Sequence, residues 1–372
     1  MSSTVTIEKL VYGGDGLARL DGQVVLTPYV LPGEQVTLET AKAKTGLLRG
    51  SSPIVLDASP YRIQPRCEYF GNCGGCQYQH IDYQFQLDQK VGILRETLRR
   101  LGGLTYEEEI PVISGDPWGY RNRIQLHFGN RESGFHRQTS NQLCAIDHCY
   151  ISAPILVDAI ARISDAVKRP EWPSFLQSME LFTNGTELQL NVLESTRPVA
   201  ARFFEWCAAF LPSLLPGAIE YQAAGFRFRI SGGSFFQVNR FLVDALVAEV
   251  IGEAAGEHAI DLYAGVGLFS LPLAKRFARV DAVERGGAAT RDLERNISES
   301  RLPIEPVRAT AETYLRSGVQ GAPDLLVVDP PRAGLGRETT AAILHTRPAR
   351  VTVVSCDPAT LARDSRQLLE HY

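Results

Sequence analysis

Long apolar runs, an excess charge of one sign and a large set of cysteines are all missing from this 372-residue sequence. No apolar stretch reaches the ~18–20 residues that span a bilayer, and the segment Met1–Ile7 lacks the basic start and apolar core of a signal peptide. We therefore expect a cytoplasmic protein that needs no membrane. Because the net charge is −4, a nucleic acid would have to bind a local basic face.

Cysteine is scarce but clustered. Seven cysteines are too few for a secreted disulfide scaffold, and in a reducing compartment such clustering indicates a metal or catalysis. A C-x5-C-x2-C pattern stands in a glycine-rich loop and a further cysteine follows much later: Cys67, Cys73, Cys76 and Cys149. Four thiolates can hold zinc or an iron–sulfur cluster, and the spacing leaves both open. Cys144 competes as the fourth ligand, whereas Cys207 lies in an amphipathic, core-like helix pattern.

The first 58 residues predict a small β domain. Short apolar bursts alternate with tight glycine and proline turns, which is typical of a five-stranded, OB-like barrel that binds oligonucleotides. Lys42, Lys44 and Arg49 would give one hairpin a basic edge, although an ordinary solvated surface carries such residues too. We therefore predict an RNA-binding barrel over residues 1–58.

The middle of the chain predicts a mixed α+β domain, formed by residues 59–85 and 110–225. It begins with the cysteine-bearing loop and continues with strand patterns on either side of a helix near 153–168. Between these two parts, apolar residues at helical spacing predict a helix over 83–101, which Gly102-Gly103 ends.

The remaining residues, 86–109 and 226–372, predict a doubly wound α/β domain. Strand and helix patterns alternate, and the buried strands are expected at 259–261, 280–283, 306–308, 325–329 and 351–354. Such alternation builds an open parallel sheet with helices on both faces. Open sheets of this kind place their chemistry at the carboxyl ends of the strands.

A glycine-rich turn ends the first of these strands, at Asp261-Leu-Tyr-Ala-Gly265-Val-Gly267, before a helix expected near Leu268. Its glycines let a ligand approach the backbone, and Glu284 at the end of the next strand can accept hydrogen bonds from two ribose hydroxyls. A nicotinamide cofactor is the rival interpretation, but Ser270 replaces the third glycine of that motif. The leading Asp261 favours S-adenosyl-L-methionine.

Two further motifs end the fourth and fifth strands. Asp329-Pro-Pro-Arg332 leaves the sheet through two prolines, which hold Asp329 in a rigid, non-helical exit. Cys356, in Ser355-Cys-Asp-Pro358, would place a thiol at the same edge, where a thiolate could act as a nucleophile. The plainer alternatives are a turn-capping aspartate and a buried, inert thiol.

The order of these motifs resembles the bacterial 23S rRNA (uracil-5-)-methyltransferase family, whose members carry an iron–sulfur cluster and make 5-methyluridine. Residues 1–58 are similar to its N-terminal TRAM domain, especially at Gly13–Arg19. Cys67–His80 resembles its cluster loop, and Ser234–Asn239 matches the segment whose glutamine faces the cofactor. The resemblance covers essentially the whole chain and implies a class I, Rossmann-like methyltransferase fold.

The resemblance also implies roles for single residues. It implies that S-adenosyl-L-methionine binds to Gln237, Tyr263, Gly265, Glu284 and Asp329, and that a [4Fe-4S] cluster binds to Cys67, Cys73, Cys76 and Cys149. Cys356 would be the nucleophile that attacks carbon 6 of uracil, and Asp329 would contact the uracil ring. The partner would be RNA, most often 23S rRNA, with tRNA as the alternative. Arg121, Arg123 and Arg137 are candidates to bind its phosphates.

The chain departs from the family at its C-terminus. The family's general base is a glutamate in an F-P-x-T-x-H-x-E segment, and the sequence reaches Tyr372 without such a segment. Glu370 does not match this motif. We therefore expect a fragment that lacks the last two strands of the sheet and forms the covalent adduct but releases product poorly. A non-catalytic RNA-binding protein is the alternative from another functional class.

Overall fold

The computed structural model describes residues 2–42, 46–319 and 321–371 of the chain. Its N-terminal region is a single six-stranded sheet, in the spatial order β1-β5-β6-β4-β3-β2. The strands are β1 (Ser2–Thr6), β2 (Lys9–Leu10), β3 (Gly16–Leu20), β4 (Gln23–Thr27), β5 (Gln35–Lys42) and β6 (Leu48–Asp57). The predicted β domain is therefore present. The expectation of five strands was wrong, because Lys9–Leu10 pairs with β3 as a short extra strand.

A buried ion pair fastens this sheet to the cysteine-bearing loop. Glu34 is fully buried and accepts two hydrogen bonds from the Arg62 guanidinium, at 2.5 and 2.7 Å. The backbone N–H groups of Leu31 and Ser59 donate to the same carboxylate. Because a buried charge is tolerated only when it is paired and hydrogen-bonded, these contacts fix the position at which the chain leaves the sheet.

The predicted helix over 83–101 ends differently from an ordinary α-helix. α1 (Tyr83–Thr97) starts at Asp82, whose side chain accepts a hydrogen bond from the Phe85 N–H. The last turn, η1 (Leu98–Gly102), is a π-helix that ends at Gly103 with φ +66°. A glycine suits this left-handed position, and the wider turn packs against α9 (Pro358–Leu368).

The central domain is an antiparallel sheet in the order β11-β10-β7-β8-β9. Its elements are β7 (Arg123–Gly129), β8 (Glu132–His136), β9 (Leu143–Ala145), α2 (Pro154–Ala166), β10 (Leu176–Thr183), β11 (Leu188–Ser195) and α3 (Ala201–Phe210). Leu156, Ile160 and Ile163 bury one face of α2 against this sheet. Cys207 on α3 is buried in the same core, as its helix pattern predicted.

The C-terminal domain is built on a parallel sheet in the order β16-β15-β14-β17-β18. Its strands are β14 (Gly256–Leu262), β15 (Phe277–Glu284), β16 (Ile304–Arg308), β17 (Leu325–Val328) and β18 (Val351–Val353), and a hairpin of β12 (Ile219–Ala223) and β13 (Phe226–Ile230) precedes them. All five predicted strands are present, and the strand order reverses beside β14, between β15 and β17. This reversal is where doubly wound sheets bind ligands.

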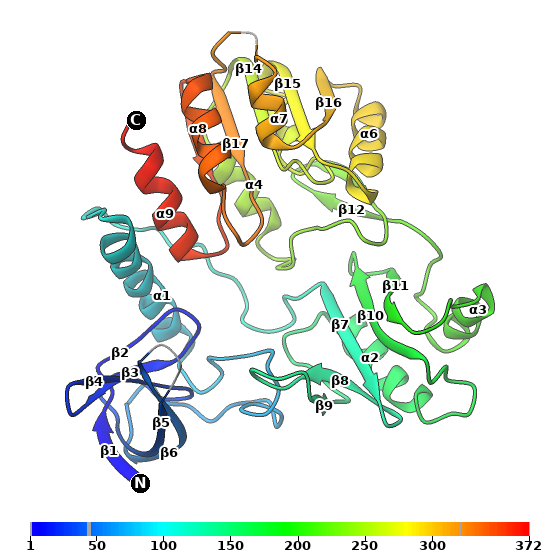
Figure 1. Cartoon of the computed structure of the whole chain (residues 1–372). Helices are drawn as coiled ribbons and strands as arrows, with labels where there is room; N and C mark the ends of the chain where they lie inside the picture. The colour runs from blue at the N-terminus through cyan, green and yellow to red at the C-terminus, as the bar shows by residue number, and fades with distance from the viewer. Residues whose placement is uncertain (1, 43–45, 320, 372) are drawn as a thin grey trace.

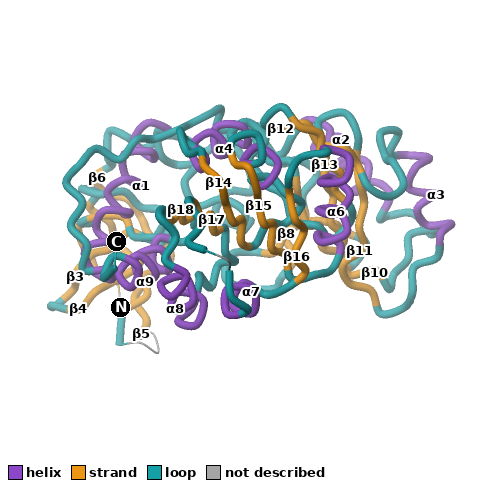
Figure 2. Tube along the Cα trace, turned by 90° about the horizontal axis from the view of Figure 1, so that it is seen from above, coloured by secondary structure: helices purple, strands orange, loops and turns teal. Residues whose placement is uncertain are grey.

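Helices cover both faces of this sheet, which confirms the doubly wound fold (Figure 2). α4 (Val243–Ile251), α5 (Ser270–Leu273) and α6 (Ala288–Ser300) share a core with one face. α7 (Ala311–Arg316), α8 (Gly336–Thr346) and α9 share a core with the other. The helix expected near Leu268 is the short α5, because the chain turns again after four residues.

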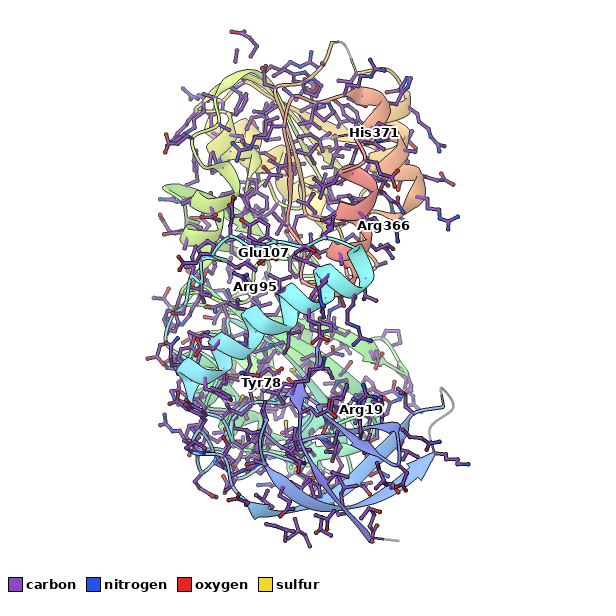
Figure 3. All side chains as sticks on the ribbon, turned by 90° about the vertical axis from the view of Figure 1, so that its left-hand side faces the viewer. Arg19, Tyr78, Arg95, Glu107, Arg366 and His371 are labelled. Atoms are coloured by element: carbon purple, nitrogen blue, oxygen red, sulfur yellow. The ribbon has the colours of Figure 1, made fainter. Side chains whose placement is uncertain are left out.

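In Figure 1 the parallel sheet lies above the N-terminal sheet and the central antiparallel sheet, and α1 lies on the left, between the N-terminal sheet and α9. Figure 3 shows α1 crossing the molecule between the N-terminal sheet below it and α9 above it. In the part of the chain that the structure describes, every helix is too short or too polar to traverse a bilayer.

Candidate active site

The glycine turn and the carboxylate of Glu284 are joined directly. The Gly265 N–H donates to Glu284 Oε2 at 3.0 Å, and the Arg285 N–H donates to Oε1 at 2.8 Å. Gly265 and Gly267 have φ values of +59° and +95°, which side chains rarely adopt. The two hydrogen bonds from backbone N–H groups fix the Glu284 carboxylate at the end of β15. Its remaining lone pairs can accept hydrogen bonds from hydroxyl groups.

Asp261 lies fully buried on β14, under the turn. Ser270 Oγ donates to its Oδ2 at 2.5 Å, and Oδ1 has no partner among the described residues. Burial, with smaller contributions from the nearby carboxylates of Asp329 and Glu284, raises the pKa of Asp261 to about 7. Three acidic groups therefore meet at one edge of the sheet, and a cation bound there would relieve their repulsion.

Asp329 and Gln237 come together although they are far apart in the sequence. Gln237 Nε2 donates to Asp329 Oδ2 at 3.2 Å. Burial raises the pKa of Asp329 to about 6. Two contacts fix the backbone around Gln237. Asn122 Nδ2 donates to the Gln237 carbonyl at 2.9 Å, and the neighbouring Phe236 is buried in the core. The carboxyl group can therefore accept or donate a hydrogen bond near neutral pH.

Tyr263, the middle residue of the turn, adopts the left-handed conformation with φ +61°. Burial raises the pKa of its phenol, which interacts with Thr339 on α8. A tyrosine at positive φ is a strained placement for a bulky residue. Its side chain is partly buried against the core that includes Ala342 and Ile343 of α8.

Cys356 is exposed, on a short rigid turn after β18. The Val354 N–H donates to the Val328 carbonyl at 2.8 Å, so the chain leaves β18 beside the end of β17, where Asp329 follows. Asp357 caps α9 by accepting hydrogen bonds from the N–H groups of Ala359 and Thr360, at 2.8 and 3.1 Å. This cap fixes the backbone next to Cys356 and leaves the thiol accessible.

The cavity beside Cys356 contains residues that the sequence did not single out. It has a volume of about 660 Å³, and its walls include Tyr12, Tyr78, Lys90 and Arg332. The Tyr12 hydroxyl donates to the Cys356 carbonyl at 3.3 Å. The loop between β2 and β3 thus contacts the turn that carries the thiol.

The four clustered cysteines line one cavity of about 600 Å³. Cys149 interacts electrostatically with each of the other three, while Cys144 is buried and outside the lining. Burial raises the pKa of the Cys67 and Cys76 thiols, and raises that of Cys73 to about 12. Within residues 2–42, 46–319 and 321–371, no three His, Cys, Asp or Glu side chains converge closely enough to hold one metal ion.

The three arginines proposed for phosphate binding differ in their surroundings. Arg123 is mostly buried, pairs with Glu180 at 2.6 Å and donates to the Ser234 carbonyl at 2.9 Å. Its role is therefore structural, which corrects the expectation. Arg121 donates to the Arg123 carbonyl at 2.8 Å and faces the cysteine cavity, whereas Arg137 is exposed at the rim of that cavity.

The predicted basic edge of the N-terminal sheet is weaker than its sequence indicates. Arg49 pairs with Asp15, and Lys44 lies outside the described residues. Lys42 remains exposed at the end of β5. A surface ion pair contributes little, but it neutralises part of the charge that a phosphate would meet.

Comparison with known proteins assigns the chain to a family. The TRAM domain family matches residues 3–52, and the family described as tRNA (uracil-5-)-methyltransferase matches residues 215–372. The 23S rRNA (uracil(1939)-C(5))-methyltransferase RlmD of Shewanella amazonensis is 33% identical over 98% of this chain and 88% of its own length. The chain belongs to the RNA (uracil-5-)-methyltransferase family. An RNA methyltransferase of Aquifex aeolicus is 31% identical over 98% of the chain and 91% of its own length.

The fold of this RNA (uracil-5-)-methyltransferase also matches a solved structure. The tRNA (uracil-54, C5)-methyltransferase of Pyrococcus abyssi, crystallised with S-adenosyl-L-homocysteine, superposes with a TM-score of 0.75. It is 25% identical, and the match covers 99% of this chain and 93% of that one. The class I, Rossmann-like methyltransferase fold is thereby confirmed.

Proposed function

We propose that this protein transfers a methyl group from S-adenosyl-L-methionine to carbon 5 of a uridine in 23S rRNA, through a covalent bond between Cys356 and carbon 6 of the uracil. The observation that carries the proposal is the exposed thiol of Cys356, at the end of the strand next to the one that Asp329 follows. The RlmD relative supports 23S rRNA as the substrate. The Pyrococcus structure makes tRNA the alternative.

The acidic edge of the sheet fits the proposed cofactor. S-adenosyl-L-methionine carries a sulfonium cation and an ammonium group, and Asp261, Glu284 and Asp329 are the carboxylates at this edge. Glu284, held by Gly265, would accept hydrogen bonds from the ribose hydroxyls. The unpartnered Oδ1 of Asp261 offers a further acceptor beneath the turn. The residues present therefore suit a cationic nucleoside.

The chemistry requires carbon 5 of uracil to become a nucleophile. The bound cofactor supplies an electrophilic methyl group. The Cys356 thiolate adds to carbon 6, and the electron pair displaced from the ring double bond makes carbon 5 enolate-like. Asp329, oriented by Gln237, would hold the polar edge of the ring during this addition. Carbon 5 takes the methyl group while the bond between the methyl carbon and the sulfonium sulfur breaks, so that neutral S-adenosyl-L-homocysteine remains. A base then accepts the carbon 5 proton, and the thiolate leaves carbon 6 by elimination.

The four clustered cysteines supply the kind of ligand that an iron–sulfur cluster needs. Cys67, Cys73, Cys76 and Cys149 line one cavity, and such clusters are held by four cysteine thiolates. Their burial keeps free thiols neutral, so that metal binding would release protons. We propose that the cluster fixes the loop that joins the N-terminal sheet to α1.

The cluster can be tested without an activity assay. Iron and acid-labile sulfide would be measured in anaerobically purified parent protein, in Cys149→Ala and in the matched control Cys144→Ala. We expect both elements in the parent and in the control, and their loss in Cys149→Ala. Zinc in place of iron, or equal losses in the two variants, would contradict this assignment.

The domain boundaries follow from the same proposal. We assign residues 1–58 to an RNA-binding TRAM domain, and residues 59–85 with 110–225 to the cluster loop and a central RNA-binding domain. Residues 86–109 and 226–372 form the methyltransferase domain, which the packing of η1 on α9 supports. The thiol of Cys356 then lies where the first and last of these domains meet.

The methyl-transfer proposal is tested by denaturing mass spectrometry. The protein is incubated with S-adenosyl-L-methionine and unmodified 23S rRNA or tRNA transcripts, with Cys356→Ala in parallel. We expect 5-methyluridine in the 23S rRNA and an RNA–protein adduct that the variant cannot form. Methylation of tRNA alone would change the substrate, and RNA binding without either product would identify a non-catalytic RNA-binding protein.

A further inference from the structure

The cavity beside Cys356 is formed by parts of the chain that are distant in sequence. Tyr12 comes from the loop between β2 and β3, Tyr78 from the cysteine-bearing loop, Lys90 from α1, and Arg332 from the segment after β17. Figure 3 shows Tyr78 between the N-terminal sheet and α1. The volume of about 660 Å³ lies within the range of roughly 300–1,000 Å³ that small-molecule sites occupy.

Lys90 is an exposed lysine in the wall of this cavity, and no acidic group among the described residues forms an ion pair with it. Within the described part of the chain its ammonium has no ion-pair partner, and desolvation alone lowers its pKa. By contrast, Lys9 nearby pairs with Glu96 on α1. Arg332, across the cavity, also makes no ion pair or hydrogen bond with the described residues. Two uncompensated cations therefore face the space that the thiol of Cys356 enters.

An anion is the ligand that such a cavity would stabilise. Lys90 and Arg332 are both exposed, so an anion that enters the cavity can reach both charges without displacing a protein partner. A uridine that reaches Cys356 within a strand carries a phosphate on each side, and contacts to phosphates position a strand without reading its sequence. The rings of Tyr12 and Tyr78 in the same walls offer apolar surface to a ribose or a neighbouring base.

We propose that Lys90 and Arg332 bind an RNA backbone phosphate adjacent to the uridine that Cys356 attacks. This inference rests on the proposed function, because it assumes that RNA is the molecule that enters the cavity. The contact would anchor the strand while the uridine is turned out of its stack toward the thiol, a step that costs unstacking energy. Lys90 and Arg332 are positioning residues, since neither touches the reacting carbon atoms.

The salt dependence of RNA affinity tests this phosphate contact. The dissociation constant for unmodified 23S rRNA transcript would be measured from low to high KCl with the parent, Lys90→Gln and the control Lys168→Gln. Lys168 is exposed and pairs with Asp165 at 3.2 Å. We expect Lys90→Gln to lower the slope of log K against log[salt] by about 0.7–1, and to weaken binding about tenfold at low salt.

The control should leave both quantities within error of the parent, and circular dichroism verifies that each variant is folded. Parental slope and affinity in Lys90→Gln would overturn the phosphate site. If no RNA is methylated but the slope still falls, the methylation proposal fails while the phosphate site stands. If methylation occurs and the slope is unchanged, only the phosphate site is wrong.

A second experiment locates the phosphate. Synthetic RNA hairpins that contain the mapped target uridine would carry a single uncharged methylphosphonate linkage on its 5′ or its 3′ side. One linkage should weaken binding to the parent about tenfold and weaken binding to Lys90→Gln clearly less, because the variant retains only the contact from Arg332. Equal losses in parent and variant at both linkages would overturn the assignment to Lys90.

Discussion

The ends of β14, β15 and β17 present carboxylates, whereas the cavity beside Cys356 presents an ammonium and a guanidinium group. Asp261, Glu284 and Asp329 form the acidic side, and Lys90 and Arg332 form the basic side. The difference matches the two proposed ligands, because the cofactor is a cation and RNA is a polyanion. The thiol of Cys356 opens to the basic side, and the end of its strand lies beside that of β17.

The two sides are also built differently. Each carboxylate lies at or just beyond the end of a strand of one parallel sheet, so the sheet brings them to a common edge. The basic side depends on α1 and on the loop around Tyr12, which come from other parts of the chain. Variants on the acidic side should therefore change methyl transfer and cofactor binding, and variants on the basic side should change RNA binding and the placement of the thiol.

The largest effect is expected from Cys356→Ser, which removes the proposed nucleophile between the acidic side and the basic side. The hydroxyl is a far weaker nucleophile than a thiolate, so kcat should fall on the order of 10⁴-fold. The dissociation constant for S-adenosyl-L-methionine, measured by calorimetry, should stay within about twofold of the parent value because the acidic side is intact. A rate within tenfold of the parent would exclude covalent catalysis by this residue.

Asp329→Asn removes one negative charge from the acidic side and keeps the size and shape of the side chain. The amide carries no charge and has one oxygen acceptor in place of two, so kcat should fall roughly 10²-fold. Gln237 can still donate to the remaining oxygen, which limits structural damage. Single-turnover methylation measures the effect. The control is Asp158→Asn on the exposed surface of α2, where Asp158 pairs only with Arg162, and it should keep the parental rate.

Tyr12→Phe tests whether the N-terminal sheet positions the thiol. It removes one hydrogen bond to the Cys356 carbonyl, so kcat should fall about three- to tenfold with little change in cofactor affinity. Tyr61→Phe is the matched control, because Tyr61 is equally exposed and its ring stacks on Phe85. Equal rates for the two variants would mean that the contact does not hold the turn.

Asp261→Asn should produce the smallest effect, and one that depends on pH. The folded-state pKa of about 7 lies above the ordinary value for aspartate, so between about pH 4 and 7 the folded protein binds a proton that the unfolded chain releases. The free energy of unfolding therefore falls as the pH rises through this window. Asp261→Asn has no such carboxyl group, so its free energy of unfolding does not fall for this reason. The Tm of the variant minus the Tm of the parent should therefore increase by roughly 3 °C from pH 5 to pH 8.

Differential scanning fluorimetry without cofactor measures this difference in Tm between the variant and the parent. Asp329 titrates in the same direction, but it is present in both proteins and largely cancels in the difference. A Tm difference that does not change with pH would mean that Asp261 is not buried in its charged form. Addition of S-adenosyl-L-methionine should reduce the advantage of the variant, because the bound cation stabilises the carboxylate of the parent.

The sequence predicted the acidic side better than the basic side. Asp261, Glu284 and Asp329 follow apolar strands, and parallel strands bring their ends to one edge, so linear order was sufficient to group them. The link between Gln237 and Asp329 came only through the family resemblance, because 92 positions separate them. The roles of these residues in binding and catalysis stay predictions until the variants are measured.

The basic side could not be predicted from local sequence patterns. Lys90 lies on an amphipathic helix, where a lysine ordinarily marks a solvated face, and its partners in the cavity depend on how α1 packs. Arg123 was misread for the related reason that a strand arginine gives no sign of a buried partner such as Glu180. Tyr12 stands beside two glycines, which indicated a turn but not the contact with Cys356.

The close approach of η1 to α9 has a consequence for how the protein is made. A side chain on Gly102 would come within 2.9 Å of the Ala362 carbonyl oxygen, although 260 positions separate the two residues. At roughly 5–20 residues per second, translation reaches α9 about 15–50 s after η1 has been made. The N-terminal sheet can fold early, but the cavity that joins Lys90 to Cys356 cannot assemble until α9 has left the ribosome.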